Sequence, residues 1–202
     1  AGVMLSACKT PKLTQAREQM ARGEYYDASQ TYRKVYNKLT KREDRPLRGE
    51  VAYEMATCYR RLNMAARASA AYQNAIRYEY PDSMTFYWLG RSLQAEGKYQ
   101  PAIEAYTKYL MWKPSDALAR EGIRGCRQAM EVKDGRNTRY IVREAKIFNS
   151  RRADYAPMYL DKELTQLYFT SSNEKSTGTS KSEITGMKNG DVYVSRKDEK
   201  GE

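Results

Sequence analysis

Apolar and small residues recur along the middle of the chain at a fixed spacing of 34 residues. Met55 is followed by Leu89, and Tyr59 by Leu93, at that spacing. Four further pairs share it: Ala56 with Gly90, Asn63 with Gly97, Ala68 with Ala102, and Tyr72 with Tyr106. A constant period of this length is typical of tandem helix–turn–helix units, whereas an ordinary helical bundle would match it only by coincidence.

The later copy carries the clearer signal. It reads Leu89-Gly90, then Gly97, Ala102, Tyr106 and finally Pro114. This order resembles the tetratricopeptide repeat (TPR), with Leu-Gly in the first helix, Gly at the turn, and a small residue followed by an aromatic one in the second. We expect Gly90 and Ala102 to let the two helices approach closely and Tyr106 to fill the gap beside them. Pro114 is expected to end the second helix, because proline cannot continue the hydrogen-bond ladder.

A first, more divergent copy and a final helix extend the array. Gly23–Ala28 repeats the turn, and Tyr32 follows Ala28 by four residues. The step from this copy to the next is 40 residues (68 − 28), so we assign the extra length to an extended charged loop over Lys38–Arg48. Ser115–Val132 is predicted to be a capping helix with an apolar face formed by Leu118, Ile123, Cys126 and Met130. Residues 9–133 are therefore predicted to form three repeats plus a cap.

Composition changes at Asp134-Gly135, and residues 134–202 favour strands. Asn149–Pro157 is predicted to be a polar turn region, and Ser171–Lys188 a long exposed or mobile loop. The strand candidates are rich in β-branched and aromatic residues: Leu167–Thr170, Asp191–Val194 and, more weakly, Tyr140–Phe148. We expect a small antiparallel sheet that exposes edges and apolar surface.

The order of these segments resembles the opening blade of a TolB-type, WD40-like β-propeller. Asp154-Tyr155-Ala156-Pro157 matches the turn before a strand pair in that family, and Asp191-Val192-Tyr193-Val194 matches the next strand. The resemblance implies a mainly α protein in which a TPR superhelix with a capping helix is followed by a partial propeller, limited to its first blade strands.

The N-terminal residues suggest a lipid anchor. Leu5-Ser6-Ala7-Cys8 resembles a bacterial lipobox, in which small residues precede a cysteine that becomes lipidated. Residues 1–8 are accordingly interpreted as a signal remnant, with Cys8 as the lipidation site. The apolar stretch before Cys8 is short and lacks a basic region, so a chance match is the alternative.

Lipobox, repeats and propeller start, in this order, resemble the multidomain OmpA-family outer-membrane lipoproteins of Bacteroidetes, which include the PorE-type components of type IX secretion. The resemblance implies a non-enzymatic protein–protein interaction scaffold, lipid-anchored on the periplasmic side of the outer membrane. Its partners would be other proteins of a secretion or envelope complex. The peptidoglycan-binding domain of that family has no matching residues here.

Two other functional classes remain open, and the net charge bears on one of them. The formal net charge is +11, which is compatible with nucleic-acid binding, but Lys and Arg are scattered among Asp and Glu instead of forming one basic tract. A basic TPR protein that contacts nucleic acid is therefore one alternative to the scaffold. A soluble cytoplasmic TPR adaptor with an unrelated β-rich tail is another.

The residues that carry catalysis or metals in other proteins are sparse. The chain has no histidine, its three cysteines have no C-x-x-C spacing, and no carboxylates form a catalytic motif, so we predict neither a metal, a cofactor nor an enzyme. Cys58 and Cys126 are 68 residues apart, two repeat periods, and should be too distant for a disulfide. Both are predicted to be buried free thiols.

The partner-binding groove of a TPR array is formed by its first helices. By repeat register, the groove residues predicted here are Leu13, Arg17, Glu50, Tyr53, Thr57, Arg60, Met84, Tyr87, Arg91 and Gln94. Tyrosine and arginine often dominate interface energies, so Tyr53, Arg60, Tyr87 and Arg91 are the main candidates, with Glu50 and Gln94. The Lys and Asn of chaperone-binding TPR domains are replaced here by Leu13, Arg17, Glu54, Met84 and Trp88, which disfavours a chaperone-tail adaptor.

Overall fold

The structure is a computed structural model that describes residues 11–133 and 144–198. The chain divides into two compact units, Ala1–Arg139 and Tyr140–Glu202. Cys8, the Asp134-Gly135 boundary and the first part of the weak strand candidate at Tyr140–Phe148 lie outside the described residues.

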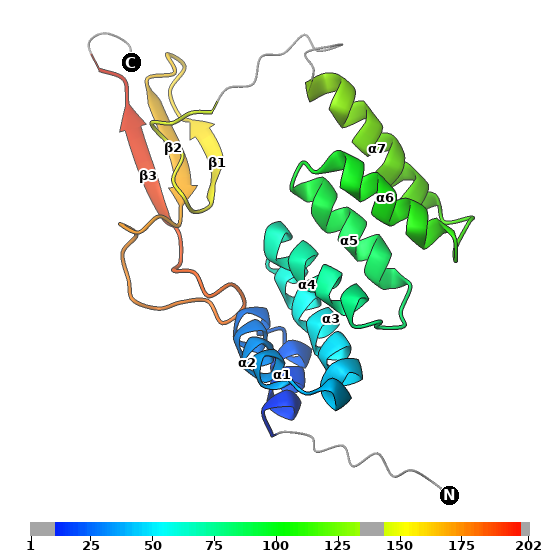
Figure 1. Cartoon of the computed structure of the whole chain (residues 1–202). Helices are drawn as coiled ribbons and strands as arrows, with labels where there is room; N and C mark the ends of the chain where they lie inside the picture. The colour runs from blue at the N-terminus through cyan, green and yellow to red at the C-terminus, as the bar shows by residue number, and fades with distance from the viewer. Residues whose placement is uncertain (1–10, 134–143, 199–202) are drawn as a thin grey trace, which may run out of the picture. The chain divides into compact units, whose positions relative to one another are not determined.

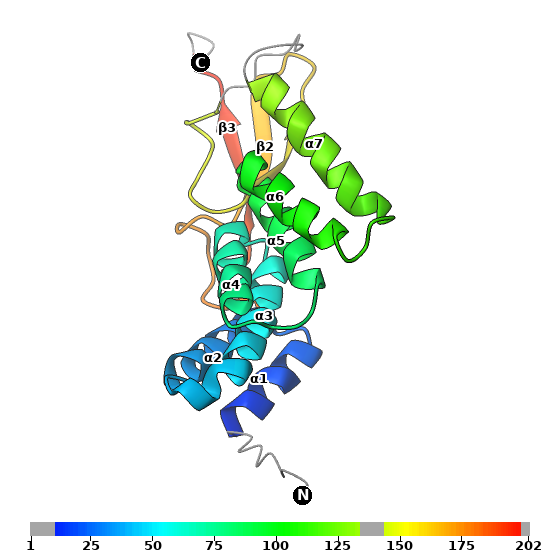
Figure 2. The same cartoon turned by 45° about the vertical axis from the view of Figure 1, so that its right-hand side comes forward.

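The first unit is a stack of helices, which confirms the predicted mainly helical, TPR-like fold. Figures 1 and 2 show the helices following one another in chain order, from the blue α1 and α2 to the green α7. The described residues form seven α-helices: α1 (Pro11–Ala21), α2 (Tyr25–Lys38), α3 (Arg45–Arg61), α4 (Ala65–Arg77), α5 (Met84–Ala95), α6 (Tyr99–Leu110) and α7 (Ala117–Lys133).

The turn inside each helix pair has the same backbone conformation in all three repeats. Gly23, Asn63 and Gly97 have φ angles of 82°, 55° and 73°, the left-handed region that glycine and asparagine tolerate best. In each repeat the next amide donates back to a carbonyl five residues earlier; Lys98 N, for example, lies 2.9 Å from Leu93 O. This bond satisfies a carbonyl at the end of the first helix and fixes the reversal into the second.

Tyrosine rings fill the core between repeats. Tyr32, Tyr72 and Tyr106 occupy equivalent positions and are fully buried. The Tyr106 ring lies against two glycines: a Cβ added to Gly90 of α5 would come within 2.8 Å of it, and one added to Gly122 of α7 within 2.6 Å. The predicted role of Tyr106 is thus confirmed, and the lack of side chains at both glycines is what admits the ring.

The charged stretch Lys38–Arg48 is not the extended loop that we predicted. The helix α2 continues to Lys38, a short 3₁₀ helix η1 covers Arg42–Asp44, and α3 begins at Arg45. Most of the extra length lengthens α3 to 17 residues, against 12 in α5. Pro46 lies in the first turn of α3, where its missing N–H costs nothing and its fixed φ favours the helix.

Two details of the last helices also differ from the sequence prediction. The helix α6 ends at Leu110, so Pro114 lies in the turn before α7 instead of terminating the helix. Leu118 is 67% exposed, whereas Ala119 and Cys126 are fully buried. The close approach of Gly122 to the Tyr106 ring determines how α7 is rotated about its own axis. That orientation places Leu118 on the solvent side.

The second unit contains a three-stranded antiparallel sheet in the order β1-β2-β3 (Figure 1). Its strands are β1 (Asp154–Tyr159), β2 (Gln166–Ser171) and β3 (Asp191–Arg196). The predicted strands at Leu167–Thr170 and Asp191–Val194 are confirmed as β2 and β3. Ala145–Phe148 is not a strand, and three strands do not make a propeller.

The predicted turn at Asn149–Pro157 is wrong in its second half, because β1 begins at Asp154. Tyr155 pairs with Thr170 and Met158 with Tyr168, and the register shifts between these two pairs. Ala156 has a φ of 53°, and Pro157 has no N–H to donate to the ladder. The Ala-Pro pair therefore forms an irregularity within a strand, which a sequence pattern easily mistakes for a turn.

The two faces of this sheet differ. On one face Phe169 stacks on Tyr193 at 5.9 Å between ring centroids, and Phe148 meets Phe169 edge-on at 6.0 Å. The opposite face carries Val192 and Val194, which are 72% and 47% exposed. The predicted exposure of apolar surface is thus observed.

The segment from Ser171 to Lys188 was predicted to be an exposed loop; its residues are in part exposed, but others are half-buried or buried, and the segment is tethered. Ser176 is buried, and its hydroxyl donates to the Ser171 carbonyl at 3.0 Å. The Thr177 hydroxyl donates to Asp191 at 3.0 Å. These bonds fix the start of the segment to the ends of β2 and β3.

Candidate protein-interaction face

The predicted groove residues lie on the first helices of the repeats, and the structure connects these helices through their side chains. Arg17 of α1 reaches α3, Arg60 of α3 reaches α5, and Gln94 of α5 lies next to α7, 3.3 Å from where a Cβ on Gly125 would stand. We call the set of ten predicted groove residues the inner face. These contacts join α1 to α3, α3 to α5 and α5 to α7, which makes the face continuous along the array.

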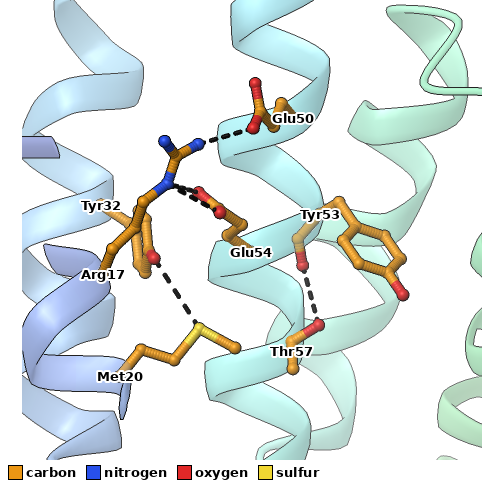
Figure 3. A network of polar contacts seen from close by, with 7 residues as sticks. All are labelled: Arg17, Met20, Tyr32, Glu50, Tyr53, Glu54 and Thr57. Atoms are coloured by element: carbon orange, nitrogen blue, oxygen red, sulfur yellow. Dashed lines mark hydrogen bonds and ion pairs between the residues drawn. The ribbon is translucent and has the colours of Figure 1, made fainter. Parts of the chain in front are cut away.

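One end of the inner face is a network of paired charges (Figure 3). The Arg17 guanidinium donates to Glu54 at 2.9 Å and to Glu50 at 2.6 Å. Burial lowers the pKa of Arg17, but the hydrogen bond and charge of Glu54 outweigh it, so the pKa is raised. Burial raises the pKa of Glu54, although Arg17 opposes that shift. This cation is therefore already engaged by two carboxylates within the molecule.

Tyr53 forms a rigid aromatic part of the inner face. Its ring stacks on Tyr80 at 4.6 Å and meets Tyr72 edge-on at 5.7 Å. Burial, followed by the charge of Asp82, raises the pKa of Tyr53, so the phenol stays protonated. A half-buried ring held on two sides offers contact area to a partner at little entropic cost.

Tyr32, Tyr72 and Tyr106 each point their hydroxyl at the residue twelve positions earlier. The Tyr106 hydroxyl donates to Gln94 at 2.8 Å, while the Tyr72 hydroxyl accepts from Arg60 at 3.3 Å. Arg60 and Gln94 are thus each held by a hydrogen bond to a buried core tyrosine. Such anchoring reduces the freedom that a surface side chain loses on binding.

The other end of the inner face is a basic pocket. The Arg60 guanidinium lies 3.8 Å above the centroid of the Trp88 ring, and Arg91 is exposed. The cavity has a volume of about 240 Å³ and is lined by Arg60, Asn63, Ala65, Trp88, Arg91, Ser92 and Ala95. We call this cavity the Arg60–Arg91 pocket.

Not every predicted residue reaches the surface. Tyr87 is only 7% exposed, because its ring packs against Trp88, Tyr106 and Tyr109. Leu13 is 3% exposed and also belongs to the core. Both are buried members of the inner face and support its exposed members from behind. Trp88, which the sequence indicated only as a replaced clamp position, lines the pocket beside Arg60.

The described residues contain no cluster of three or more residues able to hold a metal ion, and Cys58 and Cys126 are free thiols. Both thiols are buried, as predicted, and burial raises the pKa of Cys58 to about 12. None of the helices in residues 11–133 is long and apolar enough to cross a bilayer.

Comparisons with known proteins agree with this geometry. The tetratricopeptide repeat family model matches residues 50–83 and 85–110, which are the second and third repeats. No curated protein matches the chain.

Several solved structures are similar to this chain at low identity. The C-terminal TPR-containing domain of an FK506-binding protein from Plasmodium falciparum has 14% identity and a TM-score of 0.52, over 62% of this chain and 89% of that one. The UNC-45 chaperone has 15% identity and a TM-score of 0.50, over 60% of this chain and 13% of that one. The first TPR of Spaghetti (RPAP3), solved with an HSP90 peptide, has 20% identity and a TM-score of 0.47, over 58% of this chain and 88% of that one.

The fold, the repeat period and the family model coincide on the same helices, and no enzyme family is indicated. The chain therefore contains tetratricopeptide repeats, and its helical unit is a protein-interaction scaffold.

Proposed function

We propose that the inner face docks another protein of an envelope complex, with Glu50, Tyr53, Arg60, Arg91 and Gln94 as its contact residues. The observation that carries this proposal is the continuity of the inner face from α1 to α7 through side-chain contacts. A continuous face with charges at both ends and a fixed aromatic ring between them suits an extended segment of a partner.

A charge exchange on the inner face tests the docking site. Glu50→Lys combined with Arg91→Glu leaves the net charge unchanged but inverts both ends of the face. We expect the full chain carrying both changes to lose capture of its partner from solubilised membranes. The matched control exchanges charges on the outer helices of the array, with Glu104→Lys and Lys108→Glu in α6, both exposed. Capture that survives the inner exchange but not the outer one would place the docking site elsewhere.

The proposal extends to location and assembly. We infer that Cys8 carries a lipid which holds the chain at the periplasmic side of the outer membrane, and that the partner belongs to a secretion assembly such as the type IX system. The support is the order of lipobox-like residues, repeats and propeller-like strands in the sequence. The exposed apolar face of the three-stranded sheet also supports the propeller, because further blades would cover it.

Metabolic labelling with an alkyne analogue of palmitate tests the anchor. The complete gene is expressed in a bacterial host, and the labelled protein is compared with a Cys8→Ser variant. Label that depends on Cys8, together with recovery in the outer-membrane fraction, is the expected result. An unlabelled protein in the soluble fraction would instead support a cytoplasmic TPR adaptor. Salt-dependent retention on nucleic acid would support the other alternative, a basic TPR protein that contacts nucleic acid.

A further inference from the structure

We propose that the Arg60–Arg91 pocket binds carboxylate side chains of an acidic segment in the partner protein. This inference rests on the proposed docking face and names the chemistry that one part of it recognises. The pocket lies between the second and third repeats, where α3, the start of α4 and α5 meet.

Charge distinguishes this pocket from the rest of the inner face. All residues that line the pocket belong to the described part of the chain, and they include two arginines and no carboxylate. At the other end, Arg17 is held by both Glu50 and Glu54. The molecule thus neutralises the cation at one end and leaves a pair of cations facing a cavity at the other.

The geometry of Arg60 prepares it for a planar anion. Its ring contact with Trp88 at 3.8 Å and its Nε bond to the Tyr72 hydroxyl at 3.3 Å fix the plane of the guanidinium. A guanidinium held in one plane binds a carboxylate through parallel N–H donors, and stacking on an aromatic ring leaves those in-plane donors available. Arg91 supplies a second cation, which is exposed.

The size and polarity of the pocket select its occupant. A volume of about 240 Å³ fits one or two side chains and is smaller than the cavities that enclose most small-molecule ligands. Its position on a continuous face implies that the carboxylates arrive on a longer chain. Asn63, Ser92 and the Trp88 ring complete a lining that suits a short acidic segment of a protein.

Binding of a hexaglutamate peptide to the full chain tests the proposal. The peptide carries fluorescein, and its affinity is measured by fluorescence anisotropy at several salt concentrations. We expect saturable binding that weakens with salt, whereas peptides of six glutamines or six lysines should not bind. Arg91→Gln should weaken binding about fivefold, a typical value for one partly exposed charge pair, and the Arg60→Gln, Arg91→Gln double variant should abolish it.

A local signal and a matched variant exclude a general charge effect. Arg127→Gln removes the same charge from the exposed surface of α7 and should leave the affinity unchanged. In a Trp112→Phe background, Trp88 is the remaining tryptophan, and its fluorescence should change on binding. Equal losses in Arg127→Gln and Arg91→Gln, or an unchanged Trp88 signal, would overturn the proposal.

The two proposals fail in different ways. If the Glu50→Lys, Arg91→Glu exchange abolishes partner capture while hexaglutamate does not bind, the docking face stands and the acidic-segment inference is wrong. If hexaglutamate binds at Arg60 and Arg91 but the exchange leaves partner capture intact, the pocket recognises carboxylates and the docking face lies elsewhere. Arg91 is exposed, so its variants keep the test independent of any folding defect caused by changing Arg60.

Discussion

The helical array and the three-stranded sheet use similar residues with opposite results. In the array, Tyr32, Tyr72 and Tyr106 are fully buried. In the sheet unit, over residues 144–198, the buried side chains are serines, while Val192 and Val194 face solvent. Stacked repeats cover each other's apolar faces, whereas a single sheet has one layer and needs a second to form a core. A supply of apolar residues is therefore not sufficient; the architecture must provide a surface to pack them against.

Removal of a core tyrosine ring should have the largest effect on the helical array. We expect Tyr106→Ala to lower the free energy of unfolding of the array by about 3–5 kcal/mol, because the cavity would lie between Gly90 and Gly122, which cannot fill it. Urea denaturation followed by helical circular dichroism measures the change.

Phe169→Ala in β2 is the matched change in the sheet, where the ring is only half-buried. It should leave the helical transition unmoved. A shift of that transition as large as the one caused by Tyr106→Ala would show that the two units do not unfold independently.

The array was largely predictable because its core repeats. A residue that fills a gap in one repeat does so in the next, so the period of 34 residues identified Gly90, Ala102 and Tyr106 without knowledge of the fold. The lengthened α3 was missed because a charged stretch with a proline is typical both of a loop and of the first turn of a helix. Leu118 was misplaced because the rotation of α7 depends on Gly122 meeting a ring from another helix.

Overpacking gives the second-largest expected effect. Ala102 is fully buried in α6, so Ala102→Leu should destabilise the array by about 1–3 kcal/mol. Ala66→Leu in α4, at an exposed position, adds the same atoms where space is available and should change stability little. Thermal unfolding of both variants is the measurement. Equal melting temperatures would mean that the repeat register assigned to Ala102 is incorrect.

The charge network gives a smaller effect that depends on pH. Burial already raises the pKa of Glu54 above its unfolded value of 4.5, and Arg17→Met removes the hydrogen bond and charge that oppose this rise. A carboxyl whose pKa is higher in the folded state loses stability as pH rises from the unfolded value through the folded one. We expect the variant to be destabilised by about 1 kcal/mol at pH 7, a small value because Arg17 is 38% exposed.

The loss should shrink as pH falls toward 4.5, because a protonated Glu54 no longer needs its partner. Denaturation at several pH values measures this trend. In a Glu54→Gln background the same Arg17→Met change should cost little at any pH. A penalty that is independent of pH in both backgrounds would assign the effect to lost packing of the Arg17 stem.

The candidate site was only partly predictable. Repeat register placed Glu50, Arg60 and Arg91 on first helices, because helical periodicity determines which residues share a face. It could not show that Tyr87 turns inward, or that Arg60 lies over Trp88. Both depend on the angle between neighbouring helices, which brings side chains 28 positions apart into contact and leaves no periodic trace in the sequence.

The smallest expected effect comes from the exposed face of the sheet. Val192 is 72% exposed, so Val192→Lys should change the unfolding free energy of the chain by less than about 0.5 kcal/mol. Val192→Thr keeps the β-branched shape, so comparing it with Val192→Lys separates the effect of strand propensity from the effect of burial. If the proposed propeller is correct, the same substitution in a protein with further blades should cost more than about 1 kcal/mol, because the lysine would then be buried. An equally small cost in both proteins would mean that this face is never covered, and the partial-propeller proposal would lose its structural support.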